Sequence, residues 1–394
     1  MNSILIRYSL STRPWPVLLT LAWVGIASLG PVLRAEAQAA VVGAGVPRNT
    51  VTATVTVGDF PECLAISPDS QTVFVANSGS NTVSVIYVEN FPAVEATVTI
   101  SNNVNFLALS LDGNTLYVSE EPESGPGVVE VYNVTIPASP TLTTTLTTGY
   151  YPQCMAVSPD GTELYVANGE GGFASSGQNP GAVYVFYTAT NTLANIIVTN
   201  GSPFQVLFTK HGAQADVLNE TGPGFIQFID TASGKVSSST GAGGRIFGPA
   251  GMISNNTSQF GFGGPSGPLY VVDSEDYVTV CNPEDGAATN TILAVRSVFD
   301  EVLLAQPALT PRGTYLYVPY GGGRAIKFNA KADATMRPSN NKVAMIDVST
   351  GKIVGSLITV GNDPVWAQVS PDGNTLYVCN ASDGTVSVID IRPK

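Results

Sequence analysis

The chain has 394 residues, of which only 12% are charged, and it contains 40 glycines and 27 prolines. This composition suits many short strands joined by turns and disfavours long amphipathic helices. The formal net charge of −13 repels phosphate backbones, so a nucleic acid is excluded as a general partner.

Residues 1–39 have the features of a secretory signal peptide. Two arginines precede the uncharged run Pro14–Leu33, and the small-residue pattern Ala35–Ala39 follows it. We expect cleavage within that pattern, although the run is also nearly long enough for a membrane anchor. Cleavage would remove three arginines and one glutamate and change the net charge from −13 to −15. The sequence therefore predicts a secreted protein, periplasmic or extracellular, with no membrane span after cleavage and a linker over 40–48.

A β-hairpin with a tight turn recurs along the chain. Its clearest copy is Tyr151–Asn168, in which an apolar run and an alternating run flank the turn Ser158-Pro-Asp-Gly161. Proline presets φ, aspartate bonds the backbone two residues on, and glycine supplies a positive φ. The residues at the serine position lie 43 to 60 residues apart: Ser67, Ser110, Ser158, Thr209, Asn255, Thr310 and Ser370. Periods of this size, with four strands in each, are typical of a propeller.

Each copy continues with a third strand, and most copies continue with a fourth, such as Thr82–Val88 followed by Ala96–Ile100. The seventh copy ends after its third strand, Thr385–Ile391, whereas Asn49–Val57 precedes the first hairpin as an unmatched strand. Adding this strand to the seventh copy would join the termini and remove an open sheet edge. The sequence therefore predicts an all-β fold over 49–394, a seven-bladed β-propeller of four-stranded antiparallel blades whose last blade is closed by the N-terminal strand.

The turn and the strands around it resemble a known family. SPDG followed by L-Y-V-A-N or a near variant, and later T-V-S-V-I-D, is similar to the repeat of the YVTN β-propeller family, most clearly at Ser158–Asn168 and Ser370–Asp390. The resemblance covers roughly residues 50–394 and implies the propeller fold without a particular function. The fourth copy is also distantly similar to a blade of the seven-bladed lactonase family, which includes phosphogluconolactonases. That family has an Arg-His pair after the proline, where this chain has Phe204 and Gln205.

Side chains of the innermost strands define a candidate binding site at the mouth of the central channel. The candidate positions are the two residues that follow the opening proline of each blade, or that follow the residue equivalent to this proline. From these positions we predict ligand binding by Glu62, Asn105, Gln153, Phe204, Gln205, Gln306 and Trp366. A hydrolytic site would need a general base, an acid or a metal cage there. Because Glu62 is the one carboxylate among fourteen positions and no histidine occurs, we predict no catalytic group and keep Glu62 as the weak alternative.

Histidine and cysteine usage argues against a metal or a cofactor. His211 is the single histidine and occupies a turn on the face opposite the mouth, and the chain has no C-x-x-C motif. Acidic residues after the second strands could bind calcium, but no loop has EF-hand spacing. Of the four cysteines only Cys63 and Cys379 fall where a disulfide is conceivable, and buried unpaired thiols are favoured. We predict no metal and no cofactor.

Two long insertions follow second strands, Gly169–Gly181 and Gly321–Asn340, and are expected on the face that carries the mouth. Long loops on one face often carry binding, although tolerated surface insertion is an equal alternative. We expect a monomeric, non-catalytic binding or scaffold protein whose partner is a protein, a glycan or a small ligand. The alternatives are a lactonase-like hydrolase and a structural cell-surface protein.

Overall fold

The computed structural model describes most of the chain after residue 44. The described ranges are 45–89, 92–169, 181–199, 201–219, 224–237, 251–254, 268–272, 277–282, 288–293, 302–322 and 341–394. The chain divides between Val46 and Pro47, and every strand below lies in Pro47–Lys394. The predicted signal peptide, most of the predicted linker and nearly all of the two insertions lie outside the described residues. No helix in the described ranges is long and apolar enough to cross a membrane.

The described residues form seven antiparallel sheets, numbered in chain order. Sheet 1 contains β2 (Pro61–Ile66), β3 (Thr72–Asn77), β4 (Thr82–Tyr87) and β5 (Ala93–Thr99). Sheet 2 contains β6 (Asn103–Leu109), β7 (Thr115–Glu121), β8 (Val128–Asn133) and β9 (Thr141–Thr147). Sheet 3 contains β10 (Pro152–Val157), β11 (Glu163–Asn168), β12 (Ala182–Tyr187) and β13 (Thr192–Val198). Sheet 4 contains β14 (Pro203–Thr209), β15 (Gln214–Asn219), β16 (Phe225–Asp230) and β17 (Lys235–Ser237).

The last three sheets depart more from this pattern. Sheet 5 contains β18 (Gly251–Ser254), β19 (Leu269–Val272), β20 (Tyr277–Cys281) and β21 (Ala288–Leu293). In sheet 6 the first and the last strand are each divided into two short strands. The first consists of β22 (Val302–Leu304) and β23 (Ala308–Leu309), which both pair with β24 (Tyr315–Gly322). The last consists of β26 (Lys352–Ile353) and β27 (Ile358–Thr359), which both pair with β25 (Asn341–Asp347). Sheet 7 contains β28 (Pro364–Val369), β29 (Thr375–Asn380), β30 (Thr385–Asp390) and β1 (Thr50–Thr56). The helical segments of the described residues are the short 3-10 turns Lys210–Gly212 and Ala381–Asp383.

The first strand of the described chain completes the last sheet. β1 pairs antiparallel with β30 from Thr56 opposite Thr385 to Thr50 opposite Asp390. One ionic contact joins the two strands, because the Arg48 guanidinium lies 3.3 Å from the Asp390 carboxylate, which also bonds Arg392 of its own segment at 2.8 Å. The predicted pairing of residues 49–57 with the third strand of the seventh copy is therefore found.

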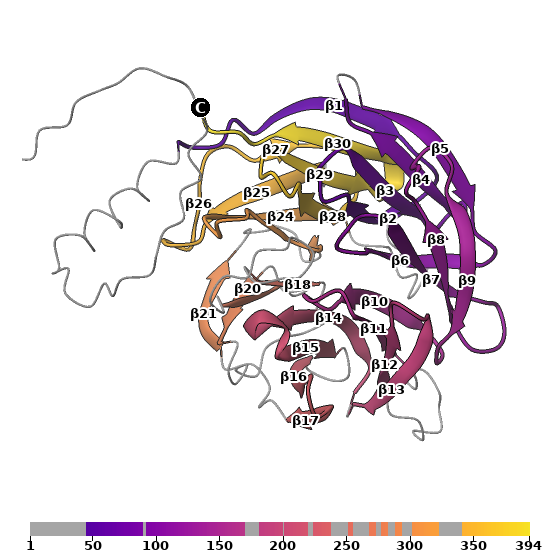
Figure 1. The fold of residues 1–394 in the computed structure, drawn as a ribbon. Coiled ribbons are helices and arrows are strands. Elements are labelled where there is room, and N and C mark those ends of the chain that lie inside the picture. Colours follow the sequence, from indigo (N-terminus) through magenta and orange to yellow (C-terminus); the bar gives the residue numbers. More distant parts are fainter. Residues whose placement is uncertain are drawn as a thin grey trace, which may run out of the picture. The chain divides into compact units, whose positions relative to one another are not determined.

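The first strand of each sheet lies toward a common centre and the last strand lies at the periphery (Figure 1). First strands of successive sheets are in contact, so that β2 contacts β6, β6 contacts β10, β10 contacts β14 and β14 contacts β18. Beyond these, β18 contacts β23, β23 contacts β28, and β28 contacts β2. This arrangement is that of a β-propeller, in which the first strands surround an axis.

The core between sheets depends on an aromatic residue that recurs in the second strand. The recurring residues, each at most 2% exposed, are Phe74, Tyr117, Tyr165, Tyr270, Tyr317 and Tyr377. The Tyr165 ring of sheet 3 meets the Phe208 ring of sheet 4 edge to face, with centroids 4.8 Å apart. Because burial of one such side chain contributes about 1.5–3 kcal/mol, the repeated aromatic residue joins each sheet to its neighbour.

The SPDG turns repeat one set of hydrogen bonds and also contact each other. In the third copy Ser158 Oγ donates to Asp160 Oδ1 (2.6 Å) and accepts from the Glu163 amide (3.0 Å). The turn glycine has a positive φ and lies against the preceding turn, since a Cβ on Gly212 would come within 3.0 Å of Pro159 Cδ. Between sheets 7 and 1 the Asp372 amide donates to Ser70 Oγ (3.2 Å). Hydrogen bonds of serine hydroxyl groups therefore hold each turn in shape and also join the turns of sheets 7 and 1.

Candidate functional site at the channel mouth

A β-bulge occurs at the mouth end of the first strand in five sheets. The pairing register shifts between Pro61 and Cys63 in β2, and an equivalent shift follows Val104 in β6, Pro152 in β10, Pro203 in β14 and Pro364 in β28. The residues displaced by these bulges, all half-buried, are Glu62, Asn105, Gln153, Phe204 and Val365. A bulge re-aims a side chain and ends regular pairing, so each of these sheets presents one side chain at the mouth.

The bulge residues differ in polarity around the mouth. Sheets 1 to 3 present a carboxylate and two amides, Glu62, Asn105 and Gln153, whereas sheets 4 and 7 present Phe204 and Val365. One half of the described mouth is therefore polar and the other half is apolar. A ligand with both a hydrogen-bonding side and an apolar side would match this division.

Hydrogen bonds between sheets 2 and 3 hold the polar half in place. Asn105 Nδ2 donates to the Pro152 carbonyl (2.9 Å), and Ser119 Oγ donates to the Gln153 carbonyl (3.1 Å). Asn105 also forms a hydrogen bond with Glu121. Burial raises the pKa of Glu121, and the bond with Asn105 lowers it by a smaller amount. The backbone beneath the polar half is therefore positioned by side chains of the neighbouring sheet.

The predicted site residues that follow the bulge positions lie deeper than the bulge residues. Gln205, Gln306 and Trp366 are buried, and Gln306 forms a parallel bridge with Trp366. The Trp366 ring meets Phe106 of sheet 2 edge to face, with centroids 5.0 Å apart, and each residue is 9% exposed. Sheets 7 and 2 are separated by sheet 1, so this ring pair lies on the channel side of β2. We infer that it forms a floor beneath the mouth.

The structure thus divides the seven predicted site residues into two groups. Glu62, Asn105, Gln153 and Phe204 are half-buried, whereas Gln205, Gln306 and Trp366 are buried. All seven stay candidates for ligand binding. The indole Nε1 of Trp366 is buried without a hydrogen-bond partner, which leaves one donor in the floor for a bound water or ligand oxygen.

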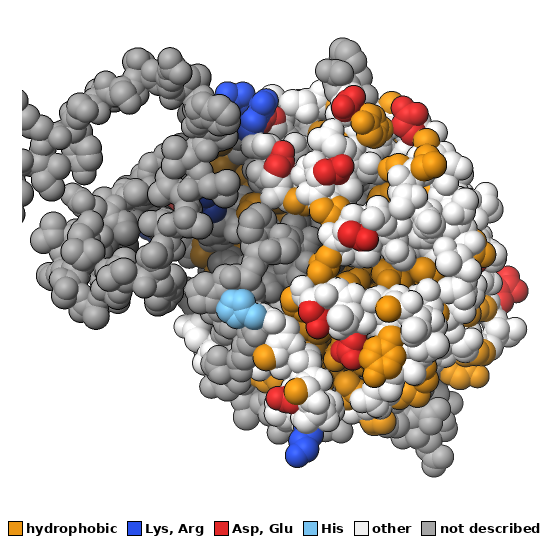
Figure 2. All heavy atoms as spheres, viewed as in Figure 1, with side chains coloured by type: hydrophobic (Ala, Val, Ile, Leu, Met, Phe, Trp, Pro, Cys, Tyr) orange, Lys and Arg blue, Asp and Glu red, His pale blue; other side chains and the backbone are white. Residues whose placement is uncertain are grey.

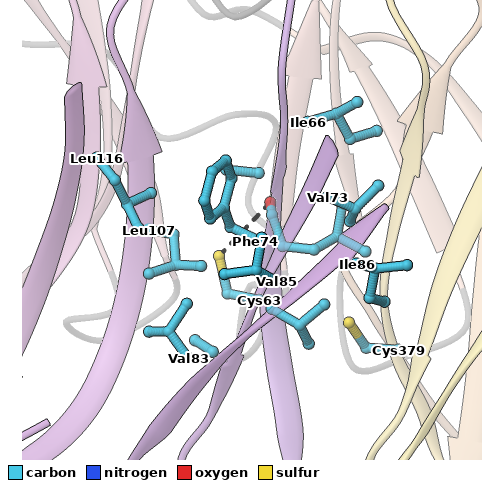
Figure 3. Close-up of a cluster of buried hydrophobic side chains, with 14 of the residues drawn as sticks. Cys63, Ile66, Val73, Phe74, Val83, Val85, Ile86, Leu107, Leu116 and Cys379 are labelled. Atoms are coloured by element: carbon cyan, nitrogen blue, oxygen red, sulfur yellow. Dashed lines mark hydrogen bonds between the residues drawn. The ribbon is translucent and has the colours of Figure 1, made fainter. Parts of the chain in front are cut away.

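All four cysteines are buried and none forms a disulfide, so the Cys63–Cys379 bond that was conceivable from sequence is not formed. Both residues lie in one hydrophobic cluster with Phe106 and Trp366, and Figure 3 shows their thiols among aliphatic side chains. Burial raises the pKa of Cys63 well above its ordinary value and raises that of Cys154 to about 12. These thiols are therefore protonated at neutral pH and act as apolar core groups.

A buried acidic pair lies in sheet 2, at a place where sheets 1 and 7 have an asparagine and a serine. Sheets 1 and 7 close the end of the second strand with an asparagine, and in sheet 7 Asn380 Nδ2 donates to Ser387 Oγ (3.0 Å). In sheet 2 this asparagine is replaced by Glu120, which accepts from the Asn102 amide (3.1 Å), and the serine is replaced by Glu130. Burial raises the pKa of Glu120, and the neighbouring Glu130 carboxylate raises it further.

The turn face carries the histidine and a set of acidic turn residues. Figure 2 shows the single histidine, which is exposed, together with scattered carboxylates on the face that is viewed. His211 has a φ of 57°, as expected for a tight turn residue, and lies at the strand end opposite the bulge. Within the described residues no group of three or more His, Cys, Asp or Glu could hold a metal ion.

Sequence reasoning identified the positions after the opening proline but missed the residue before it. Phe60, Tyr151 and Asp363 occupy that place in sheets 1, 3 and 7, and all three have a positive φ. Phe60 is 48% exposed and Tyr151 is 42% exposed. An exposed aromatic residue directly before a blade's opening proline was the available signal. The acidic pair was missed because Glu120 and Glu130 are ten residues apart in the sequence and meet only through the pairing of two neighbouring strands.

Comparisons with known proteins agree with this architecture. A family model described as the choice-of-anchor I domain matches residues 62–239, which is less than half of the chain. The fold is similar to that of a chain of hydrazine synthase from Kuenenia stuttgartiensis, with a TM-score of 0.68 and 18% sequence identity. This match covers 85% of the present chain and 96% of the other. No curated protein matches the sequence. The structural likeness shows the β-propeller fold alone.

Proposed function

We propose that the chain is a cell-surface or secreted, monomeric β-propeller that binds a ligand over its channel mouth without catalysing a reaction. The observation that carries this proposal is the repeated bulge, which presents a different side chain at the mouth from each of five sheets. Stability alone does not require those residues to differ, because the same backbone distortion accommodates all of them. Variation on a fixed scaffold is typical of a binding surface.

The proposal takes the propeller as a closed ring of seven blades over 49–394, of the YVTN type. Three observations support closure: β1 completes sheet 7, β28 contacts β2, and the Asp372 amide bonds Ser70 across the first and last turns. A closed ring gives the bulge residues a common mouth. In this proposal the ring pair of Phe106 and Trp366 lies beneath the ligand, which contacts the bulge residues.

The proposed location rests on three observations. The sequence of residues 1–39 has the pattern of a signal peptide. The choice-of-anchor I match suggests a cell-surface or secreted protein. The acidic net charge of −13 also suits solubility outside the cell.

The test is retention of a defined ligand by the purified chain, with a variant of the mouth as control. Envelope extracts and culture medium are passed over the immobilised protein, and retained glycans, peptides and small molecules are identified by mass spectrometry. A ligand that is lost when Glu62→Ala and Gln153→Ala are combined, and kept when the turn-face residue Tyr187 is changed to Ala, supports the proposal. Turnover of a lactone panel that Glu62→Gln abolishes would instead establish a lactonase-like hydrolase and overturn it.

A further inference from the structure

Two exposed aromatic residues are held in an unusual backbone conformation beside the mouth. Phe60 (φ 50°) and Tyr151 (φ 54°) each precede the opening proline of a blade, and the Asp363 equivalent has φ 57°. In all three cases the residue's carbonyl accepts the amide of the loop that follows the second strand: from Ser78 to Phe60, from Gly169 to Tyr151 and from Ala381 to Asp363. The left-handed conformation is therefore part of the scaffold.

The Phe60 ring lies against Gly79 of its own sheet, but the scaffold does not require a large side chain at this position. Glycine, asparagine and aspartate tolerate a left-handed conformation, and sheet 7 uses aspartate, whereas bulky side chains rarely adopt it. Sheets 1 and 3 nevertheless place large rings there, and about half of each ring residue stays exposed. Backbone strain at an exposed aromatic side chain favours a role in contact with something outside the chain.

Between the two rings lies a polar stretch contributed mainly by sheet 2. The position equivalent to Phe60 is the exposed Asn103, and beside it Asn105 bonds both the Pro152 carbonyl and Glu121. Tyr150, which is 50% exposed, stands next to Tyr151. The order along three adjacent sheets is thus aromatic, amide and carboxylate, and aromatic.

We infer that Phe60 and Tyr151 are stacking platforms for a neutral glycan chain that runs across the mouth edges of sheets 1 to 3. The inference rests on the proposed function and names its ligand class. An aromatic face stacks on the apolar C–H face of a pyranose ring, while amides and carboxylates bond its hydroxyl groups. The chain's negative charge repels acidic polymers, so the glycan is uncharged. A protein partner would favour one contiguous apolar patch, whereas here the rings are separated by polar residues.

The placement of the two rings also fixes the length of ligand required. Phe60 and Tyr151 belong to sheets that are separated by one whole sheet, and packed sheets are about 10 Å apart. A single sugar unit cannot reach both rings. Affinity should therefore rise with chain length until an oligosaccharide spans sheets 1 to 3.

The experiment measures calorimetric binding of the full-length purified protein to cello-, xylo-, manno- and chito-oligosaccharides of one to six units. Variants Phe60→Asn and Tyr151→Asn remove each ring and keep a residue that tolerates the left-handed conformation, as Asp363 does in sheet 7. Matched controls are Tyr87→Asn and Tyr187→Asn, which remove exposed rings (37% and 49%) at the turn end. We expect one series to bind, with each mouth variant about tenfold weaker or more and the controls unchanged.

Three outcomes would overturn the inference. They are binding that does not depend on chain length, binding that the turn-end variants weaken as much as the mouth variants do, and absence of binding to every series while the thermal unfolding curve shows folded protein. The proposed function is judged separately. If no sugar binds but a peptide or small molecule is retained through Glu62 and Gln153, the proposed function stands and the glycan inference fails.

Discussion

The two ends of each hairpin were shaped under different requirements. At the turn end, sheets 1, 2, 3 and 7 use the same serine–aspartate bond, with Oγ–Oδ1 distances of 2.5 to 2.6 Å. At the mouth end the same four sheets share a bulge but present Glu62, Asn105, Gln153 and Val365. Identical side chains with identical bonds indicate a structural role, and different side chains on identical backbones indicate a functional one. The contrast predicts where substitutions affect folding and where they affect binding.

The largest effect on stability is expected at the floor of the mouth, where one side chain both packs in the core and borders the binding site. Trp366→Ala would remove a buried ring that packs on Phe106 and should lower the free energy of unfolding by about 3–5 kcal/mol. Val365→Ala is the matched control, since this adjacent side chain is half-buried on the bulge and should cost about 1 kcal/mol or less. Chemical denaturation measures both. Equal losses at the two positions would contradict the division between mouth and floor.

A smaller effect is expected at the turn end. Ser158→Ala should cost about 1–2 kcal/mol, because the Glu163 amide loses its acceptor and Asp160 loses a donor. Thr190→Ala, in an exposed turn, is the control and should change stability by less than about 0.5 kcal/mol.

The same turn predicts a dependence on pH. The hydrogen bond from the Ser158 hydroxyl lowers the pKa of Asp160 in the folded protein. This bond therefore contributes fully to stability above the pKa that Asp160 has in the unfolded chain, and its contribution is lost as the pH falls. The difference between the wild type and Ser158→Ala should therefore narrow below about pH 4. A difference that stays constant down to pH 2 would contradict this assignment.

The acidic pair of sheet 2 should produce the opposite dependence. Burial raises the pKa of Glu120 to about 8, and the adjacent carboxylate of Glu130 adds to the shift. A raised folded pKa means that stability is greatest below the unfolded pKa, near 4.5, and declines as pH rises toward 8. Glu120→Gln should remove this decline and be more stable than the wild type at pH 8, whereas Glu95→Gln, on an exposed edge strand, should not. Thermal unfolding between pH 4 and 9 measures how the stability of the wild type and of both variants depends on pH.

Much of the fold was readable because the repeat unit is regular. The SPDG turns, the strand after each and the pairing of residues 49–57 with the last strand follow from local turn chemistry and from alternation of apolar residues. The split strands of sheet 6 were not predicted, although Pro307 lies in the interruption between β22 and β23 and Gly355 in the one between β26 and β27. Proline and glycine weaken a strand without showing by themselves that it is divided.

The site was less readable than the fold. Alternation in a regular strand cannot show that Glu62 and Cys63 are separated in depth, since the bulge between Pro61 and Cys63 has no sequence signature. The left-handed φ of Phe60 was hidden for a related reason, because bulky residues are not expected there. Contacts between sheets that are not neighbours, such as Phe106 of sheet 2 with Trp366 of sheet 7, depend on how the sheets are arranged around the axis and require the tertiary structure.

The smallest effect on stability is expected from the bulge residues themselves, which makes them the sharpest test of the contrast. Gln153→Ala and Glu62→Gln should each change the free energy of unfolding by less than about 0.5 kcal/mol, because both side chains are only half-buried and the backbone bonds around them remain. The same variants should weaken ligand retention at the mouth, whereas Ser158→Ala should destabilise without altering affinity in the folded fraction. If Gln153→Ala lowers stability as much as Ser158→Ala does, the mouth residues are structural and the difference between the two ends disappears.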